Sequence, residues 1–218
     1  MAKKKNITKD NMISWYMEYV LEYNKQPDSV FHFAKVNHFD EAVFYRYFGS
    51  FEALEKEIFK AFFDNTANLL QKNNDDKNFD ARNKLLSFYY TFFENLTANR
   101  SYVVYALKNK KDQLKTLKTL SELKRSFSEF IESLDIEIID LKEERLEKLQ
   151  HRGIKESAWI QLLATIKFWL EDSSPAFEKT DIFIEKSINA SFDLMNITPF
   201  KSVIDLGKFL FKEKIHMN

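Results

Sequence analysis

Residues that interrupt regular structure are scarce in this sequence, which has three glycines and three prolines among 218 residues. Hairpins and β-bulges draw on these residues at most turns, so a sheet protein of this length would need many more of them. Long segments rich in Lys, Glu and Leu, which favour helices, run without a break. The sequence therefore predicts an all-α fold.

Charge and composition exclude several classes of protein. Lys plus Arg and Asp plus Glu balance at 33 each, which excludes a uniformly basic surface but allows a local basic face. Cysteine is absent, which excludes a disulfide framework, a thiolate metal site and a cysteine nucleophile. No apolar run follows the basic start MAKKKNITKD, and none reaches 18 residues. We therefore expect no secretory signal, no membrane span and a cytoplasmic, soluble protein.

The sequence also lacks the patterns of enzymatic chemistry. The four histidines are scattered, and no H-E-x-x-H, G-x-S-x-G or P-loop pattern occurs. The acid pairs fall on the predicted solvent faces of helices. We therefore expect no enzyme, no metal site and no cofactor.

Hydrophobic periodicity divides the first 71 residues into four helices, which Pro27 and Gly49 help to separate. The predicted ranges are 8–24, 29–36, 40–48 and 50–71. The predicted N-caps are Thr8, Asp28 or Ser29, Asp40 and Ser50.

The polar stretch KNNDDKNFD, Lys72 to Asp80, is the strongest boundary in the chain. The segments after it are periodic and apolar again, and they predict a second helical domain. Its helices are predicted at 80–97, 99–109, 112–150 with a break near Asp135, 154–172, 178–196 and 199–213.

The first three helices are too few to bury much surface alone, so we expect the fourth helix to support them. Two short helices joined by a tight turn, with a first helix packed across them, form a helix-turn-helix. The second short helix is then presented to the major groove of DNA. Residues 40–48 are therefore the predicted recognition helix.

The segment SVFHFAKVNHFDEAVFYRYFGSFEALEKEIF, residues 29–59, resembles the DNA-binding signature of the TetR family of transcriptional regulators. That signature reads roughly [ST]-V-x-x-I-A-x-x-A-G-V-S-x-x-[ST]-[LF]-Y-x-[HY]-F-x-[SN]-K-x-x-L. The residues in register are Ser29, Val30, Phe33, Ala34, Phe39, Phe44, Tyr45, Tyr47, Phe48, Ser50 and Leu54.

This resemblance implies a three-helix head joined by a long fourth helix to a C-terminal helical bundle. It implies a helix-turn-helix DNA-binding domain at 1–50, a linking helix at 50–71, and a ligand-binding and dimerisation domain at 72–218. The expected function is a transcriptional regulator, in most such proteins a repressor, that binds a palindromic operator in double-stranded DNA as a homodimer. A small apolar ligand is expected to control it.

Within the head, several side chains have chemistry suited to DNA. Arg46 carries a fork that matches the O6 and N7 atoms of guanine. Ser29 and the tyrosine hydroxyls can donate to phosphates, and the lysines of the N-terminal arm can neutralise them. The candidate DNA-binding residues are Lys4, Lys5, Ser29, Glu41, Ala42, Tyr45, Arg46 and Tyr47.

Three positions depart from the TetR pattern. His38 stands where the family has Gly, Asp40 where it has Ser, and Phe51 where it has Lys. Residues 1–48 carry seven Lys or Arg against six Asp or Glu, a small excess for binding a polyanion. A second interpretation therefore stays open, a TetR-fold lipid-binding or interaction protein that no longer binds DNA.

The segment LLSFYYTFFENL, Leu85 to Leu96, is the predicted wall of a ligand pocket, although the same rings could simply fill the core. A cavity with this lining would suit a fatty acyl or aromatic ligand. The candidate ligand-binding residues are Phe88, Tyr89, Phe92, Phe93 and Trp169.

The predicted helices 154–172 and 178–196 are the candidates for the dimer contact, because the family normally uses its last helix pair for a four-helix seam. The candidate interface residues are Ala158, Leu162, Ile166, Ile184, Ile188 and Phe192.

The corner between these two helices, IKFWLEDSSPAFEKTDIFIEKS, combines polar residues and rings around Pro175. It is either a helix–loop–helix corner or the polar mouth of an aromatic pocket. Over about twenty residues it also resembles a lipid-binding protein of ubiquinone biosynthesis that keeps the TetR fold without repressing transcription.

Overall fold

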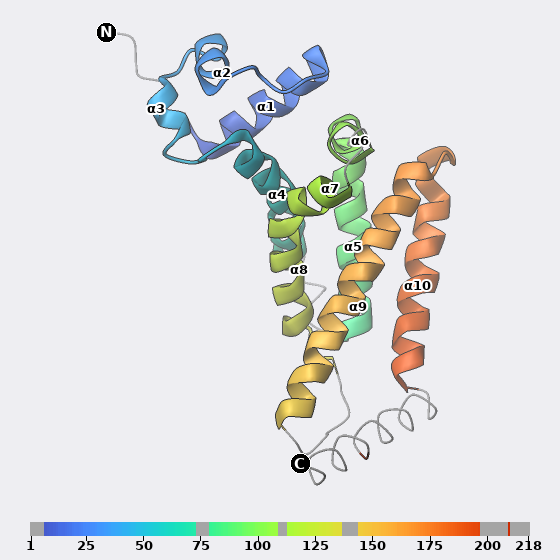
Figure 1. Ribbon diagram of the computed structural model, residues 1–218. Coiled ribbons are helices and arrows are strands. Elements are labelled where there is room, and N and C mark those ends of the chain that lie inside the picture. Colours follow the sequence, from blue (N-terminus) through green and yellow to red (C-terminus); the bar gives the residue numbers. More distant parts are fainter. Residues whose placement is uncertain (1–6, 73–78, 109–112, 137–143, 197–208, 210–218) are drawn as a thin grey trace. The chain divides into compact units, whose positions relative to one another are not determined.

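Figure 1 shows the computed structural model, which describes residues 7–72, 79–108, 113–136, 144–196 and 209. All regular structure within these residues is helical, so the predicted all-α class is confirmed. The elements are α1 (Lys9–Tyr23), α2 (Val30–Val36), α3 (Glu41–Phe44), α4 (Phe51–Lys72), α5 (Ala81–Ala98), α6 (Arg100–Lys108), α7 (Gln113–Thr119), α8 (Ser121–Ser133), α9 (Glu144–Glu171), the 3₁₀ turn η2 (Pro175–Phe177) and α10 (Glu178–Asn196).

The chain divides into two compact units. The first unit comprises Met1–Asn68 and Phe92–Ser126, and the second comprises Leu69–Thr91 and Phe127–Asn218. The helices α4, α5 and α8 therefore contribute residues to both units. None of the helices in the described ranges is long and apolar enough to cross a membrane.

Side-chain caps start α1 and α2 at the residues that the sequence predicts. Thr8 Oγ1 accepts the Asn11 N–H at 3.2 Å, and Asn11 Oδ1 accepts the Thr8 N–H at 3.1 Å, which completes a capping box. Ser29 Oγ accepts the His32 N–H at 3.0 Å at the start of α2. Each cap satisfies a backbone donor that has no partner inside its own helix.

The turn between α2 and α3 passes through His38, whose φ of 58° lies in the left-handed region. The Phe39 N–H donates to the Ala34 carbonyl at 3.0 Å, which closes the turn. Asp40 then caps α3 by accepting the Ala42 N–H at 2.8 Å.

The helix α3 is shorter than predicted, because it ends at Phe44 and not near Phe48. Tyr45, Arg46 and Tyr47 form a tighter turn, in which the Tyr47 N–H donates to the Phe44 carbonyl at 3.0 Å. Bonds of this i to i−3 type commonly end a helix by tightening its last turn. This tightening returns Phe48 to the core, 5.5 Å from Phe44 between ring centroids.

Aromatic rings fill the core of the head. Phe33 lies at its centre, with ring centroids 6.3 Å from Tyr16, 6.2 Å from Phe44 and 5.7 Å from Phe51, all in edge-to-face geometry. Trp15 stacks on Phe39 at 5.8 Å. Edge-to-face ring pairs are favourable beyond their buried area, which suits a small head that cannot bury much surface.

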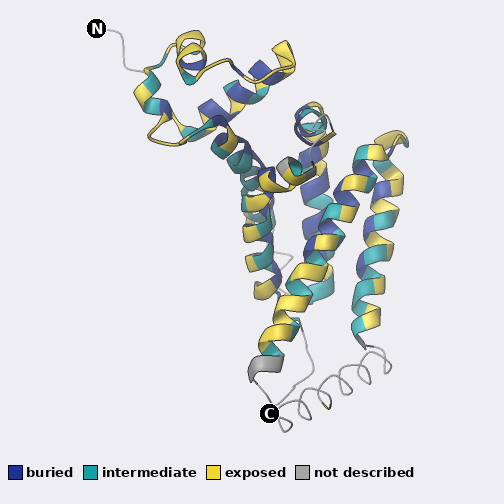
Figure 2. Ribbon diagram, in the orientation of Figure 1, coloured by how far each residue is buried: buried dark blue, intermediate teal, exposed yellow. Residues whose placement is uncertain are grey.

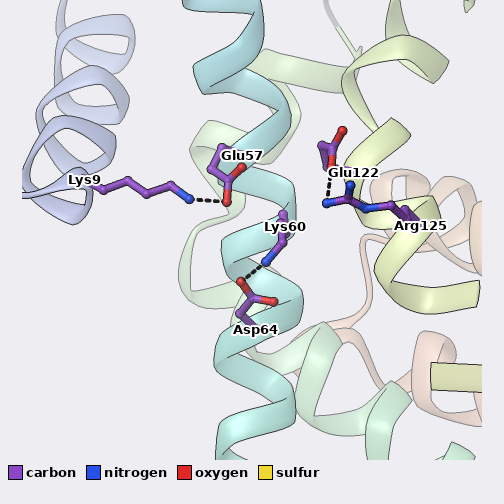
Figure 3. Close-up of polar contacts among 6 residues, drawn as sticks. All are labelled: Lys9, Glu57, Lys60, Asp64, Glu122 and Arg125. Carbon is purple, nitrogen blue, oxygen red and sulfur yellow. Dashed lines mark hydrogen bonds and ion pairs between the residues drawn. The ribbon is translucent and has the colours of Figure 1, made fainter. Parts of the chain in front are cut away.

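The helix α4 connects this head to the rest of the first unit. In Figure 3, Lys9 of α1 reaches across to Glu57 of α4, with which it forms an ion pair. Asn95 of α5 donates to the Phe62 carbonyl of α4 at 3.0 Å. The Tyr102 ring of α6 lies 6.3 Å from the Phe59 ring of α4.

In the second unit, α9 and α10 run side by side in opposite directions (Figure 1). Gln161 Nε2 of α9 donates to Ser187 Oγ of α10 at 3.2 Å. Arg82 of α5 forms an ion pair with Asp193 of α10 at 2.6 Å, and its guanidinium lies 5.4 Å from the Phe192 ring centroid.

The predicted division between helices at 150 and 154 is wrong, because α9 runs from Glu144 to Glu171 through Gly153. A glycine in a helix interior costs about 1 kcal/mol relative to alanine, which is too little to end a helix whose flanks favour helix. The predicted break near Asp135 is confirmed, since α8 ends at Ser133 and Asp135 has a φ of 47°. The predicted helix 199–213 lies outside the described residues except for Phe209.

Candidate nucleic-acid interface

The predicted DNA-binding side chains of the described head are all accessible to some degree. Ala42, Tyr45, Arg46 and Tyr47 are exposed and Glu41 is half-exposed, while Phe44 and Phe48 beside them are buried. Packing therefore separates a ring-filled inner side from a polar outer side at this turn. Lys4 and Lys5 lie outside the described residues.

The two tyrosines of this turn make different hydrogen bonds. The Tyr45 hydroxyl lies 3.4 Å from Glu41 Oε1, one turn back along the chain, and donates a long hydrogen bond to it. The Tyr47 hydroxyl donates to the Ile7 carbonyl at 3.3 Å. Ile7 therefore lies beside the turn that carries Arg46.

Ser29 is exposed at the start of α2, and α2 packs against α3. Its oxygen already accepts the His32 N–H, so its hydroxyl hydrogen is the group that it can offer to an anion. The neighbouring Asp28 is held by Lys25 at 2.9 Å. The hydrogen bond from Lys25 lowers the pKa of Asp28, and its charge adds to this effect.

The predicted ligand-binding residues are all buried core residues. Phe88 and Tyr89 belong to the second unit, where Phe88 lies 5.5 Å from Phe127 and 4.7 Å from Phe130 between ring centroids. Burial raises the pKa of Tyr89. Trp169 also belongs to the second unit, whereas Phe92 and Phe93 belong to the first.

The sequence analysis did not single out the buried residues in and next to α8, although their spacing in the sequence indicates them. Buried residues recur along this segment at helical spacing, a pattern typical of a core-facing helix. They are Leu120, Leu123, Phe127, Ile131 and Leu134.

The corner between α9 and α10 is organised by the Asp172 carboxylate. Asp172 Oδ1 accepts the Ser174 N–H at 2.8 Å and the Ser174 hydroxyl at 2.7 Å, while its Oδ2 atom faces Thr180. The corner also holds two non-glycine residues at positive φ, Ala176 at 50° and Phe177 at 60°. The Phe177 ring packs 6.0 Å from Trp169. These contacts give the polar residues of the corner a role in holding α10 to α9.

Of the predicted interface residues on α9 and α10, four are buried within the chain itself and so form its own core. These are Leu162, Ile166, Ile184 and Ile188. Ala158 and Phe192 are half-buried. Figure 2 shows that both helices also carry exposed residues on their other faces.

On that outer side, α9 and α10 form an open, mostly apolar hollow of about 470 Å³. Phe168 of α9 stacks on Phe183 of α10 there, with ring centroids 4.6 Å apart and planes 8° from parallel. The hollow is lined by Phe168, Lys179, Ile182, Phe183, Lys186 and Ser187. Sequence analysis missed this surface, because its apolar residues are fewer than those of the core face.

Residues 84–210, more than half of the chain, match the family model described as "Tetracyclin repressor-like, C-terminal domain". The chain belongs to the TetR family of transcriptional regulators. No curated protein matches the sequence. Among solved structures, the TetR-family chain is similar to one described as the fatty acid degradation regulator FadR from Bacillus halodurans. The two are 15% identical, with a TM-score of 0.48, and the match covers 84% of this chain and 95% of that chain.

Two departures of this TetR-family chain from the usual head sequence have a structural explanation. His38 occupies the position where the family has glycine, and it takes the left-handed conformation that glycine adopts without strain. Phe51 occupies the position of the family's lysine, and it is buried between Tyr16, Phe33 and Phe44, at 5.5, 5.7 and 5.4 Å between ring centroids. In this TetR-family chain, the side chain at position 51 therefore packs in the hydrophobic core of the head.

Proposed function

We propose that this protein is a DNA-binding transcriptional regulator that binds a palindromic operator as a homodimer and responds to a small apolar ligand. The observation that supports it most directly is the side chain of Arg46, which is exposed and whose guanidinium makes no ion pair or hydrogen bond with any described residue. An exposed guanidinium without a partner on the outer side of a helix-turn-helix is suited to bidentate contact with guanine. Repression is the expected outcome of operator binding.

Phosphate contacts are proposed for Ser29, and for Tyr45 and Tyr47 once DNA draws their hydroxyls away from Glu41 and the Ile7 carbonyl. Glu41 and Ala42 are proposed to face base edges. Glu41 can accept from a cytosine amino group, and the methyl of Ala42 can contact a thymine methyl. Lys4 and Lys5 precede Ile7, whose carbonyl is bonded to Tyr47. An arm that starts at this point is suited to follow the backbone beside the recognition turn.

A homodimer is proposed because two heads must reach successive major grooves. The outer side of α9 and α10 supports it. Ile160, Ala164 and Phe168 follow one another at intervals of four on α9, and Ile182 and Leu194 are exposed on α10. A two-fold axis through this side would bury both stripes against their copies. The core residues Leu162 and Ile184 would then support the interface from behind.

The ligand is proposed to be apolar, fatty acyl or aromatic, and to act in the second unit among the rings of α5 and α8. Phe88 lies within 5.5 Å of Phe127 between ring centroids, so a ligand has to displace or reorient rings to enter. It changes DNA binding only if it binds the two conformations of the protein with different affinity.

A second candidate function is a lipid-binding or interaction protein that has lost DNA binding. It is favoured by the exposed Asp40, the half-exposed Glu41 and the burial of Phe51, which leave the head with little excess positive charge. Both candidates share one fold and differ in their response to a polyanion.

Salt dependence of duplex binding distinguishes the two candidates. We expect the protein to bind a labelled random duplex at 50 mM salt in an anisotropy titration. The affinity should fall linearly on a log–log scale as salt rises, with a slope of about −0.9 per phosphate contacted. Lys5→Ala should make this slope shallower by about 0.9, because Lys5 is proposed to neutralise a phosphate, whereas Lys155→Ala, a charge-matched control in the second unit, should not. A flat salt response would favour the second candidate.

A further inference from the structure

A hollow of about 320 Å³ lies in the second unit, between the end of α8 and the first half of α9. Part of its lining is apolar: the side chain of Ile131 is buried, and those of Ile136 and Ile154 are half-buried. It shares no lining residue with the hollow on the outer side of α9 and α10. Its volume is at the lower end of the range for small-molecule sites, which suits a ligand with one ring or a short chain.

The rest of the lining is ionisable. Glu132 of α8 and Lys155 of α9 form an ion pair at 3.2 Å across the hollow. His151 lies one helical turn before Lys155, on the same face of α9. The carboxylate of Asp135 makes no ion pair or hydrogen bond with any described residue. Two carboxylates and one ammonium leave the lining with a net charge of −1, with His151 not counted.

Asp135 occupies a position where a carboxylate is electrostatically unfavourable. The helix α8 ends at Ser133, and Asp135 turns the chain just beyond it with a left-handed φ of 47°. Asparagine adopts this conformation as readily as aspartate. The carbonyl end of a helix carries a partial negative charge, and the last turn of α8 contains no basic residue that would offset it. The fold therefore has no need of a carboxylate at this position, whereas a bound cation has.

We propose that this hollow binds a small primary amine with an apolar body. The ammonium donates to the Asp135 carboxylate and to a ring nitrogen of His151, and the apolar body covers the isoleucines. A carboxylate ligand of the same shape is repelled by the net charge, and an alcohol leaves the charge of Asp135 without a counterion. The inference goes beyond the proposed function, since neither DNA nor the apolar ligand among the rings of α5 and α8 takes part.

The isoleucines of the hollow provide the reporter for the test. The full-length protein, with ¹³C-labelled isoleucine methyls, is titrated with phenethylamine at about pH 8, where an ordinary amine is charged and an ordinary imidazole is neutral. The methyl signals of Ile131, Ile136 and Ile154 should shift and saturate. Those of Ile184 and Ile188, which are buried elsewhere in the same unit, should not. The matched compounds 2-phenylethanol and 3-phenylpropionate should bind at least about five-fold more weakly, because neither supplies a cation.

Two variants should change the affinity for phenethylamine in opposite directions. Asp135→Asn should weaken it about five- to ten-fold, because a charged acceptor is lost. Lys155→Met should strengthen it about two- to five-fold, because it removes the ammonium that neutralises Glu132. Glu129→Gln, which changes an exposed acid of α8 outside the hollow, is the control that should bind as the wild type does. Asp135→Asn should unfold at the same or a higher temperature, so weaker binding in this variant does not report a damaged fold.

Equal affinity for phenethylamine and 2-phenylethanol would overturn the proposal, and so would an unchanged affinity in Asp135→Asn. Shifts of the same size at Ile184 and Ile188 would show that the ring contacts the protein without a site, which is also incompatible with it. None of these measurements involves DNA. Failure of the wild type to bind any duplex would end the proposed function and leave the amine titration unaffected.

Discussion

Asp172 and Thr180 are joined by two hydrogen bonds across the corner between α9 and α10. Asp172 Oδ2 accepts the Thr180 backbone N–H at 3.0 Å and the Thr180 hydroxyl at 2.7 Å. Burial alone would raise the pKa of Asp172, but the hydrogen bonds from Ser174 and Thr180 outweigh it and lower the pKa to about 2. The carboxylate is therefore ionised in the folded protein at any pH above that value.

Asp172→Asn should destabilise the protein by about 2 kcal/mol, because an amide nitrogen would face donors that now bond to a carboxylate. The folded pKa lies below the unfolded value of about 4. The stabilisation is therefore fully present above pH 4 and is lost as pH falls toward 2. Urea unfolding at several pH values measures both effects, and Asp172→Asn should remove this part of the acid sensitivity. Glu178→Gln, an exposed acid in the first turn of α10, is the control that should retain it.

Phe51→Lys restores the residue that TetR heads usually carry at this position, and it should destabilise the protein by about 3–5 kcal/mol. The reason is the loss of a buried ring together with the burial of an amine. Chemical unfolding measures the effect, and Phe51→Leu should be the milder variant. A stable Phe51→Lys protein with tighter duplex binding would contradict the assignment of this position to the core.

His38→Gly should stabilise the protein by a few tenths of a kcal/mol to about 1 kcal/mol. Glycine relieves the left-handed strain of about 1–2 kcal/mol, while its greater freedom in the unfolded chain offsets part of the gain. His38→Ala keeps the β-carbon and should show no gain. Thermal unfolding of both variants decides the matter, and equal midpoints would show that His38 is not strained.

Arg46→Ala should weaken the preference for the operator over random duplex by about 1–3 kcal/mol, the discrimination at one base pair. Ser29→Ala should weaken operator and random duplex about equally, because a phosphate contact carries no sequence information. Competition titrations with an operator obtained by selection from random duplexes measure both ratios. An unchanged preference in Arg46→Ala would refute its role in reading bases.

Ile182→Glu should convert a dimer to monomers without unfolding the protein, because Ile182 is exposed in the single chain and would face its copy across the proposed axis. Sedimentation velocity measures the assembly and circular dichroism checks the fold. Leu21→Glu, an exposed apolar residue of α1, is the control that should remain dimeric. A dimer that survives Ile182→Glu would exclude the outer side of α9 and α10 as its interface.

Features set by local chemistry could be predicted from the sequence. Thr8, Ser29 and Asp40 start helices because their own side chains satisfy nearby backbone donors, and that chemistry depends on a few residues. The positive φ of His38 follows from the register of the turn. The predicted division between residues 150 and 154 is wrong because the unfavourable helix propensity of Gly153 is overcome by the flanking sequence.

Features set by packing between distant segments could not be predicted in this way. Both α9 and α10 have one face rich in apolar residues and an opposite face with fewer of them. Periodicity cannot show which of the two faces packs inside the chain and which is left for a second copy. Periodicity therefore predicts Leu162 and Ile184 at the interface, whereas both are buried inside the single chain. The hydrogen bond from the Tyr16 hydroxyl to Glu55 spans 39 residues and leaves no periodic signal.

The stack of Trp15 on Phe39 gives the head an optical reporter of its own. The other two tryptophans, Trp159 and Trp169, lie in the second unit, and both are buried. In a Trp159→Phe, Trp169→Phe background, all tryptophan emission would come from Trp15 of α1. Titration of such a protein, with duplex or with a lipid, would record the motion of the head without any attached dye.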